Sequence, residues 1–138
     1  MTPWFLLFLT IVFWGTAPIL DKIALNKSTP LQGLVIRSVA IMVVLCVGLL
    51  FTGKFKEAFN VDVKSMAFFA ASGIVAGLLG VFTYYSALKM GNASRIVPLA
   101  SVYPLIAFIL GVLILKENFT FTKLLGTLFV VLGVFLLK

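Results

Sequence analysis

Residues 66–88 read MAFFAASGIVAGLLGVFTYYSAL, an apolar run that no charged residue interrupts. An α-helix needs about 20 residues to cross the hydrocarbon core of a bilayer, so this run is long enough to span a membrane. Similar runs lie on both sides of it and are separated by short charged breaks. The sequence therefore predicts an all-α integral membrane protein with five spans: Pro3–Leu20, Leu31–Phe51, Met66–Leu88, Ile96–Leu115 and Phe119–Leu137.

The composition excludes an ordinary soluble domain. Of the 138 residues, 62% are hydrophobic and 11% are charged, whereas roughly a quarter are charged in soluble domains. Almost every residue belongs to a span or a short link, so we expect one transmembrane domain over residues 1–138 and no enzyme activity. The net charge is +7, but the basic residues are scattered singly. We therefore expect lipid headgroups as partners and no nucleic acid.

The breaks distribute Lys and Arg almost evenly between the two membrane faces. Cationic loops normally stay in the cytoplasm and fix the orientation, but here neither face carries a clear excess. The sequence therefore predicts dual topology, and two oppositely oriented copies would form an inverted repeat, on which many secondary transporters are built. The face with the N-terminus carries Lys54, Lys56, Lys64, Lys116 and Lys123, and the other carries Lys22, Lys27, Arg37, Lys89, Arg95 and Lys138.

Prolines interrupt two of the predicted spans. Pro18 removes a backbone hydrogen bond from the first span, and Pro98 and Pro104 free the carbonyls of Ser94 and Ala100 in the fourth. We expect kinks at these positions. The freed carbonyls are either satisfied by Ser, Thr or neighbouring helices, or they line a water-filled cavity, and the sequence leaves both open.

Small residues mark one face of the third span. They are spaced three or four apart, which places them on one side of a helix, and they include a GxxxG pair. One interpretation is a helix-packing surface formed by Gly73, Gly77 and Gly80. The other is the floor of a groove along which a substrate moves, with Tyr84 at its end. The face consists of Ala70, Gly73, Gly77, Gly80, Tyr84 and Ala87.

Ionisable residues within the spans are scarce. The chain has no His, and Arg37 is the one ionisable residue clearly inside a span, roughly two turns into the second. Its charge is costly in lipid, so it either pairs with Asp21 near the headgroups or contacts an anionic group of a substrate. Glu117 is expected near the N-terminus of the last helix, where it suits the helix dipole. We expect no metal site and no cofactor.

Several motifs occur in order along the chain: Trp14-Gly15, Lys22, Pro30, Arg37, the run YYSALKMGNAS at residues 84–94, Pro98, Tyr103-Pro104, Leu115-Lys116-Glu117, and Gly126 with Gly133. Together they resemble the EamA domain of the drug/metabolite transporter superfamily. Typical members carry two such domains, inverted relative to one another. This chain carries one, so the resemblance implies that a second copy or another partner supplies the other half. Lys116 replaces the Gly that commonly precedes the Glu, which puts a tight turn there in question.

The resemblance implies a transporter that moves a small-molecule substrate by alternating access, as an antiparallel homodimer in a membrane that we expect to be the prokaryotic cell (inner) membrane. Candidate substrate-binding residues are Trp14, Arg37, Tyr84 and Tyr103. Aromatic rings would supply apolar area and Arg37 a charge partner. Basic residues near one mouth favour anionic or zwitterionic cargo. The sequence leaves the substrate, the direction of flux and the coupling ion open.

Two alternatives remain at this point. The first is a proton-coupled exporter similar to the small multidrug resistance family, whose members share an essential Glu in the first span, where residues 3–20 have none. The second is a non-transporting membrane assembly subunit that packs through the Gly73 to Gly80 face.

Overall fold

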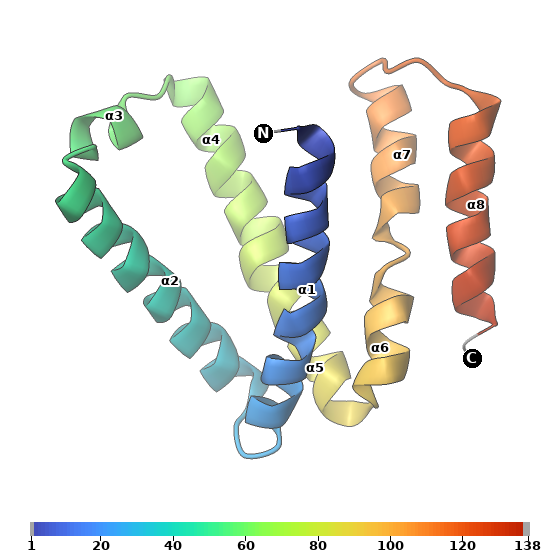
Figure 1. The fold of residues 1–138 in the computed structure, drawn as a ribbon, viewed down its shortest axis with the longest axis horizontal. Helices are drawn as coiled ribbons and strands as arrows, with labels where there is room; N and C mark the ends of the chain where they lie inside the picture. Colours follow the sequence, from blue (N-terminus) through green and yellow to red (C-terminus); the bar gives the residue numbers. More distant parts are fainter. Residues whose placement is uncertain (1, 137–138) are drawn as a thin grey trace. The chain divides into compact units, whose positions relative to one another are not determined.

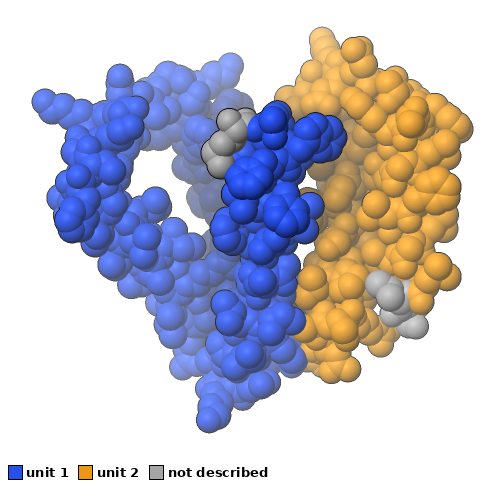
Figure 2. Space-filling model, viewed as in Figure 1, with its two compact units in different colours: residues 1–89 blue, residues 90–138 orange. Residues whose placement is uncertain are grey.

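The computed structural model describes residues 2–136, which form helices and no strand (Figure 1). Two positions named above, Leu137 and Lys138, lie outside the described residues. The chain divides into two compact units, residues 1–89 and residues 90–138 (Figure 2). The elements are α1 Pro3–Leu25, α2 Pro30–Thr52, α3 Phe55–Phe59, α4 Val63–Ser72, the π-helix η1 Gly73–Gly80, α5 Val81–Met90, α6 Ala93–Ala100, α7 Tyr103–Leu113 and α8 Phe121–Phe135.

The five predicted spans are confirmed as five apolar helical segments. Four of them, residues 3–25, 30–52, 63–90 and 93–113, are long and apolar enough to cross a membrane, and α8 is a shorter apolar helix. The first span continues beyond the predicted Leu20 to Leu25. Its charged residues therefore do not end the helix, and Asp21 lies within the last turns of α1 instead of at its end.

The start of α2 is fixed by local hydrogen bonds. The Thr29 hydroxyl accepts from the Gln32 backbone N–H at 3.2 Å, and the Gln32 side chain accepts from the Thr29 N–H at 2.8 Å. This capping box satisfies two backbone donors that the first helical turn leaves unpaired. Pro30 follows at a position where its missing N–H costs nothing. Because α1 ends at Leu25 and α2 begins at Pro30, the link between them is short. The two helices lie side by side.

The third span is one continuous helical segment, but its centre is π-helical. The sequence pattern predicted a uniform helix over Met66–Leu88, whereas Gly73–Gly80 adopts the wider π form between α4 and α5. Three glycines in eight residues lower the cost of leaving the α-helix, because glycine has no side chain that resists a change of backbone angles. Such wide turns are rare and occur frequently at functional sites.

The fourth span is interrupted where the prolines predicted a disturbance. α6 ends at Ala100 and α7 begins at Tyr103, with Pro104 in its first turn. Proline lacks the N–H that would bond to the Ala100 carbonyl, so the helix breaks before it. By contrast, α1 runs through Pro18 as one helix.

The link between α7 and α8 contains the turn whose residue departs from the family pattern. Lys116 adopts a left-handed backbone with φ of 55°, a conformation that glycine adopts more easily. The tight turn is therefore kept despite the Lys. Glu117 was expected at the start of the last helix, and this is wrong, because no acidic residue lies in the first turn of α8. Its carboxyl carbon lies 3.6 Å from where a Cβ on Gly111 would be.

Most large apolar side chains in the described chain are exposed, including Trp4 at 81% and Phe51 at 88%. In water such a surface would associate, but in a bilayer the lipid tails cover it at little cost. Four of the buried apolar side chains, Leu25, Leu34, Tyr85 and Leu88, belong to unit 1. They mark the place where unit 1 is most tightly packed.

Candidate functional site

The buried residues of unit 1 come from the end of α1, the start of α2 and the end of α5. Leu25, Leu34, Leu88 and Tyr85 are buried there, and Tyr85 is only 2% exposed. Gly33 makes room for this ring, because a Cβ at Gly33 would lie 3.1 Å from Tyr85 Cε2. We call this region the closed end of unit 1.

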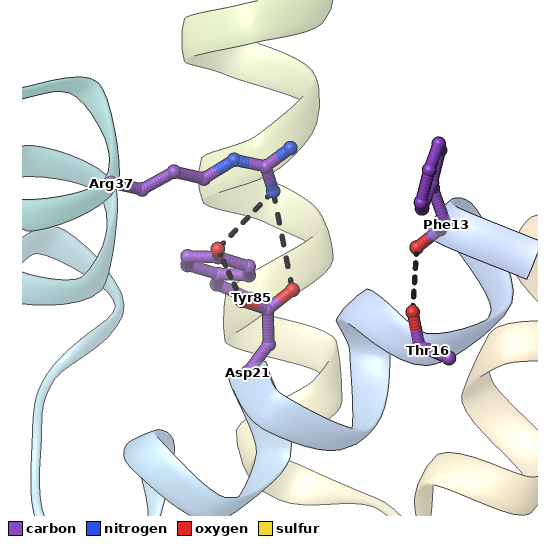
Figure 3. A network of polar contacts seen from close by, with 5 residues as sticks. All are labelled: Phe13, Thr16, Asp21, Arg37 and Tyr85. Atoms are coloured by element: carbon purple, nitrogen blue, oxygen red, sulfur yellow. Dashed lines mark hydrogen bonds and ion pairs between the residues drawn. The ribbon is translucent and has the colours of Figure 1, made fainter. Parts of the chain in front are cut away.

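A polar network joins the three helices at the closed end (Figure 3). The Tyr85 hydroxyl donates to Asp21 Oδ1 at 2.7 Å, and Arg37 Nη1 donates to the Tyr85 hydroxyl oxygen at 3.3 Å. Arg37 Nη1 also lies 4.0 Å from Asp21 Oδ2. The pairing of Arg37 with Asp21, one of the two alternatives that the sequence left open, is thus present. Tyr85 lies between the two charges and contacts both.

Two lysines bind backbone carbonyls at the closed end. Lys22 Nζ donates to the Leu88 carbonyl at 2.7 Å, and Lys89 Nζ donates to the Ser28 carbonyl at 2.6 Å. The Leu88 carbonyl belongs to the last turn of α5, where carbonyls have no partner within the helix and attract cations. These contacts tie α5 to α1 and to the α1–α2 link.

Sequence reasoning missed Tyr85 and chose its neighbour Tyr84. The Tyr84 hydroxyl is buried and has no hydrogen-bond partner within residues 2–136, and its ring lies 6.1 Å from the Tyr85 ring. Two adjacent tyrosines point in different directions on a helix, and both hydroxyls need a partner when buried. Leu88 lies three residues from Tyr85 and four from Tyr84, so helical spacing in the sequence does not distinguish the two.

The other candidate residues lie elsewhere. Trp14 is 67% exposed on α1, and Tyr103 is 56% exposed on α7, in unit 2. Within unit 1 the structure brings together Arg37, Tyr84 and Tyr85, but not Trp14. The Arg37 side chain is 46% exposed, so a further group can reach it while it contacts Asp21 and Tyr85.

Beside the network, unit 1 contains a groove of about 620 Å³ between α2 and the η1–α5 segment. Arg37 contributes to its lining, as do Gly73 and Gly77, whereas Gly80 does not. An added Cβ at Gly73 or Gly77 would meet nothing within 4 Å, but at Gly80 it would lie 3.3 Å from the Val75 carbonyl oxygen. The hollow in unit 1 is visible in Figure 2. α2 and α4 diverge from the closed end toward α3, and we call that region the open end (Figure 1).

Unit 2 contains a smaller cavity of about 210 Å³, with Arg95 as the charged member of its lining. Its other lining residues include Leu99 and Val134. Within the described residues, no three His, Cys, Asp or Glu side chains are grouped to hold a metal ion. Each of the two cavities thus has one charged residue, Arg37 or Arg95, in an otherwise largely apolar lining.

The model of the EamA-like transporter family matches residues 1–138. The chain belongs to this family. An uncharacterized protein of Methanocaldococcus jannaschii is 32% identical over 130 residues, which cover 94% of this chain and 91% of that protein. An uncharacterized transporter in the cobO 3'region of a Sinorhizobium species is 28% identical over 129 residues, with the same coverage. No solved structure matches the chain. Family and fold together make it an integral membrane protein of a transporter family.

Proposed function

We propose that this EamA-family chain moves a small metabolite across the membrane by alternating access, as an antiparallel homodimer of single-domain subunits. The observation that carries this proposal is Arg37, half-exposed beside a groove of about 620 Å³ and held by Tyr85 and Asp21. A charged side chain inside a span is costly in lipid and typical of a substrate pathway. The bacterial and archaeal relatives support a prokaryotic cell membrane as its location.

In this proposal Arg37 binds an anionic or carboxylate group of the cargo, and Tyr84, in the same unit, contacts its apolar part. The guanidinium carries five N–H donors, and the two contacts described above both use Nη1. Its planar fork can therefore hold a carboxylate with two parallel bonds.

The second copy is proposed from two observations. Neither membrane face has an excess of Lys and Arg large enough to fix one orientation. In addition, Gly73 and Gly77 present bare backbone with open space before it, and small residues are the surface through which membrane helices approach closely. We propose that Gly73, Gly77 and Gly80 face the inverted copy, which covers the groove.

The proposal is tested by reconstituting the protein in liposomes and measuring uptake of amino acids, nucleosides and lipophilic cations. For any zwitterionic or anionic compound transported, Arg37→Gln is expected to lower uptake sharply, because the charge is lost. Arg37→Lys keeps the charge but loses the fork, so uptake should fall to an intermediate level. If both variants transport at the original rate, Arg37 does not select cargo. If no compound is transported by the wild type, the assembly-subunit interpretation gains support.

A further inference from the structure

The groove of unit 1 runs along α2. Its lining follows α2 from Leu34 to Leu49, through Ile41 and Leu45 on the same helical face. The fifteen steps from Leu34 to Leu49 correspond to about 22 Å along the helix. Opposite them lie Gly73 and Gly77, whose missing side chains leave the space open.

The chemistry of the groove changes along its length. Arg37 is the charged residue of the lining and lies near the closed end, with Ser38 beside it. From Ile41 to Leu49 the α2 wall is formed by apolar side chains and Cys46. The groove thus has a cationic site at one end and a hydrocarbon-like channel along the rest.

We propose that the groove binds a single-chain anionic amphiphile, with its headgroup on Arg37 and its hydrocarbon chain along α2 toward the open end. One leaflet of a bilayer is about 15 Å deep, half the thickness of the hydrocarbon core. From Arg37 to Leu49 the groove extends about 18 Å along α2, a length comparable to the hydrocarbon chain of such a molecule. The inference rests on the proposed transport function and names the class of cargo.

The energetics assign selectivity to the headgroup. A hydrocarbon chain gains little by moving from lipid into an apolar groove, because the two environments are equally apolar. Pairing of an anion with Arg37, by contrast, offsets the cost of a partly desolvated charge and adds charge-assisted hydrogen bonds. Binding should therefore require the anionic head, while the chain determines where the bound molecule lies.

Cys46 provides a direct test, because it is the single cysteine of the chain and lies in the groove wall. We would measure its rate of alkylation by N-ethylmaleimide in the full protein, with and without hexadecanoate. At ten times its Kd, hexadecanoate should slow the reaction about tenfold, because only the empty fraction reacts. Butanoate, which has the same head and lacks the long chain, should leave the rate unchanged.

Matched controls separate groove binding from general partition into the lipid. Val44 is 70% exposed on the same helix and is not part of the groove lining. In the double variant Val44→Cys with Cys46→Ser, hexadecanoate should give no protection. Arg37→Gln should abolish the protection of Cys46, and hexadecanol should protect neither cysteine.

Three outcomes would overturn the inference: equal protection by hexadecanol, equal protection at position 44, or a Cys46 that is unreactive without ligand and reacts only on dilution of the protein. The last result would mean that a second copy fills the groove. Protection of Cys46 without transport of any compound would contradict the proposed transport function but support binding of a single-chain anionic amphiphile. Transport without protection of Cys46 would contradict only the proposal that the ligand is such an amphiphile.

Discussion

The two ends of unit 1 are built in different ways. At the closed end, Leu25, Leu34, Tyr85 and Leu88 are buried, and the network of Asp21, Tyr85 and Arg37 joins three helices. At the open end, α2 and α4 are joined through the short helix α3, in which the Phe55 and Phe59 rings stack at 6.2 Å. Phe59 also contributes to the groove lining. Buried side chains and a polar network thus hold the helices together at the closed end, whereas at the open end α2 and α4 are connected through α3.

The largest effect is expected at Gly33. Gly33→Leu forces side-chain atoms against Tyr85, and overpacking of this kind costs about 1–3 kcal/mol or more. We expect a marked loss of thermal stability in detergent. Gly48→Leu on the same helix is the control, because a Cβ there meets nothing within 4 Å. Equal losses for both variants would show that the closed end is not the better packed one.

The two adjacent tyrosines give a sharper comparison. Tyr85→Phe removes the hydroxyl that contacts both Asp21 and Arg37, and one such bond within a membrane contributes about 0.6 to 1.7 kcal/mol. Tyr84→Phe should cost little, because its hydroxyl has no partner within residues 2–136. Thermal unfolding of the two variants tests this. A larger loss for Tyr84→Phe than for Tyr85→Phe would contradict the assignment of the network to Tyr85.

At the groove, Gly77→Leu should separate function from stability. The new side chain enters open space, so the thermal stability of the subunit should change by less than that of Gly33→Leu. Transport and dimerisation should both fall, because the added side chain occupies the groove and the space in which the second copy is proposed to pack. If cross-linking and liposome uptake show that both survive, the glycine face serves neither packing nor binding.

The smallest effect is expected from Asp62, which precedes α4 near the open end. Its carboxylate accepts the Ser65 backbone N–H at 2.9 Å. Hydrogen bonding from Ser65 lowers the pKa of Asp62. The ionised Asp62 carboxylate therefore stabilises the start of α4 above the unfolded pKa of about 3.9. This stabilisation is lost as the pH falls through the lower pKa of the folded state.

Asp62→Asn keeps a capping group without a titrating carboxyl. Protection factors of the amides at the start of α4, which correct for the pH dependence of intrinsic exchange, should therefore fall in acid for the wild type and remain constant in the variant. If protection at the start of α4 changes with pH in the same way in both proteins, titration of Asp62 does not cause the change.

Much of the fold follows from the sequence, because apolar length alone determines which segments can span a bilayer. The break before Pro104 was also predictable, since a proline cannot donate the missing bond. The π-helix over Gly73–Gly80 was not, because spacing of three and four describes an α-helix, and only the backbone shows that the glycines widen the turn.

The site was predicted in part. Arg37 and its pairing with Asp21 could be predicted because an intramembrane charge needs a partner. Tyr85 could not be chosen over Tyr84 from composition, because the direction of each ring depends on how α5 packs against α1 and α2. The position of Tyr103 in the other unit likewise depends on tertiary structure that the sequence pattern does not contain.

The claim that two inverted copies form the transporter is tested most directly by biasing their orientation. Ala58→Lys with Asn60→Lys adds charge to one face, and Asn26→Lys with Asn92→Lys adds it to the other, at exposed positions. The same positions changed to Gln serve as controls without added charge. Each Lys variant should insert in one orientation and lose transport alone, and co-expression of the two should restore it. Full transport by either Lys variant alone, with its C-terminal tag on one side of the membrane, would contradict the antiparallel dimer.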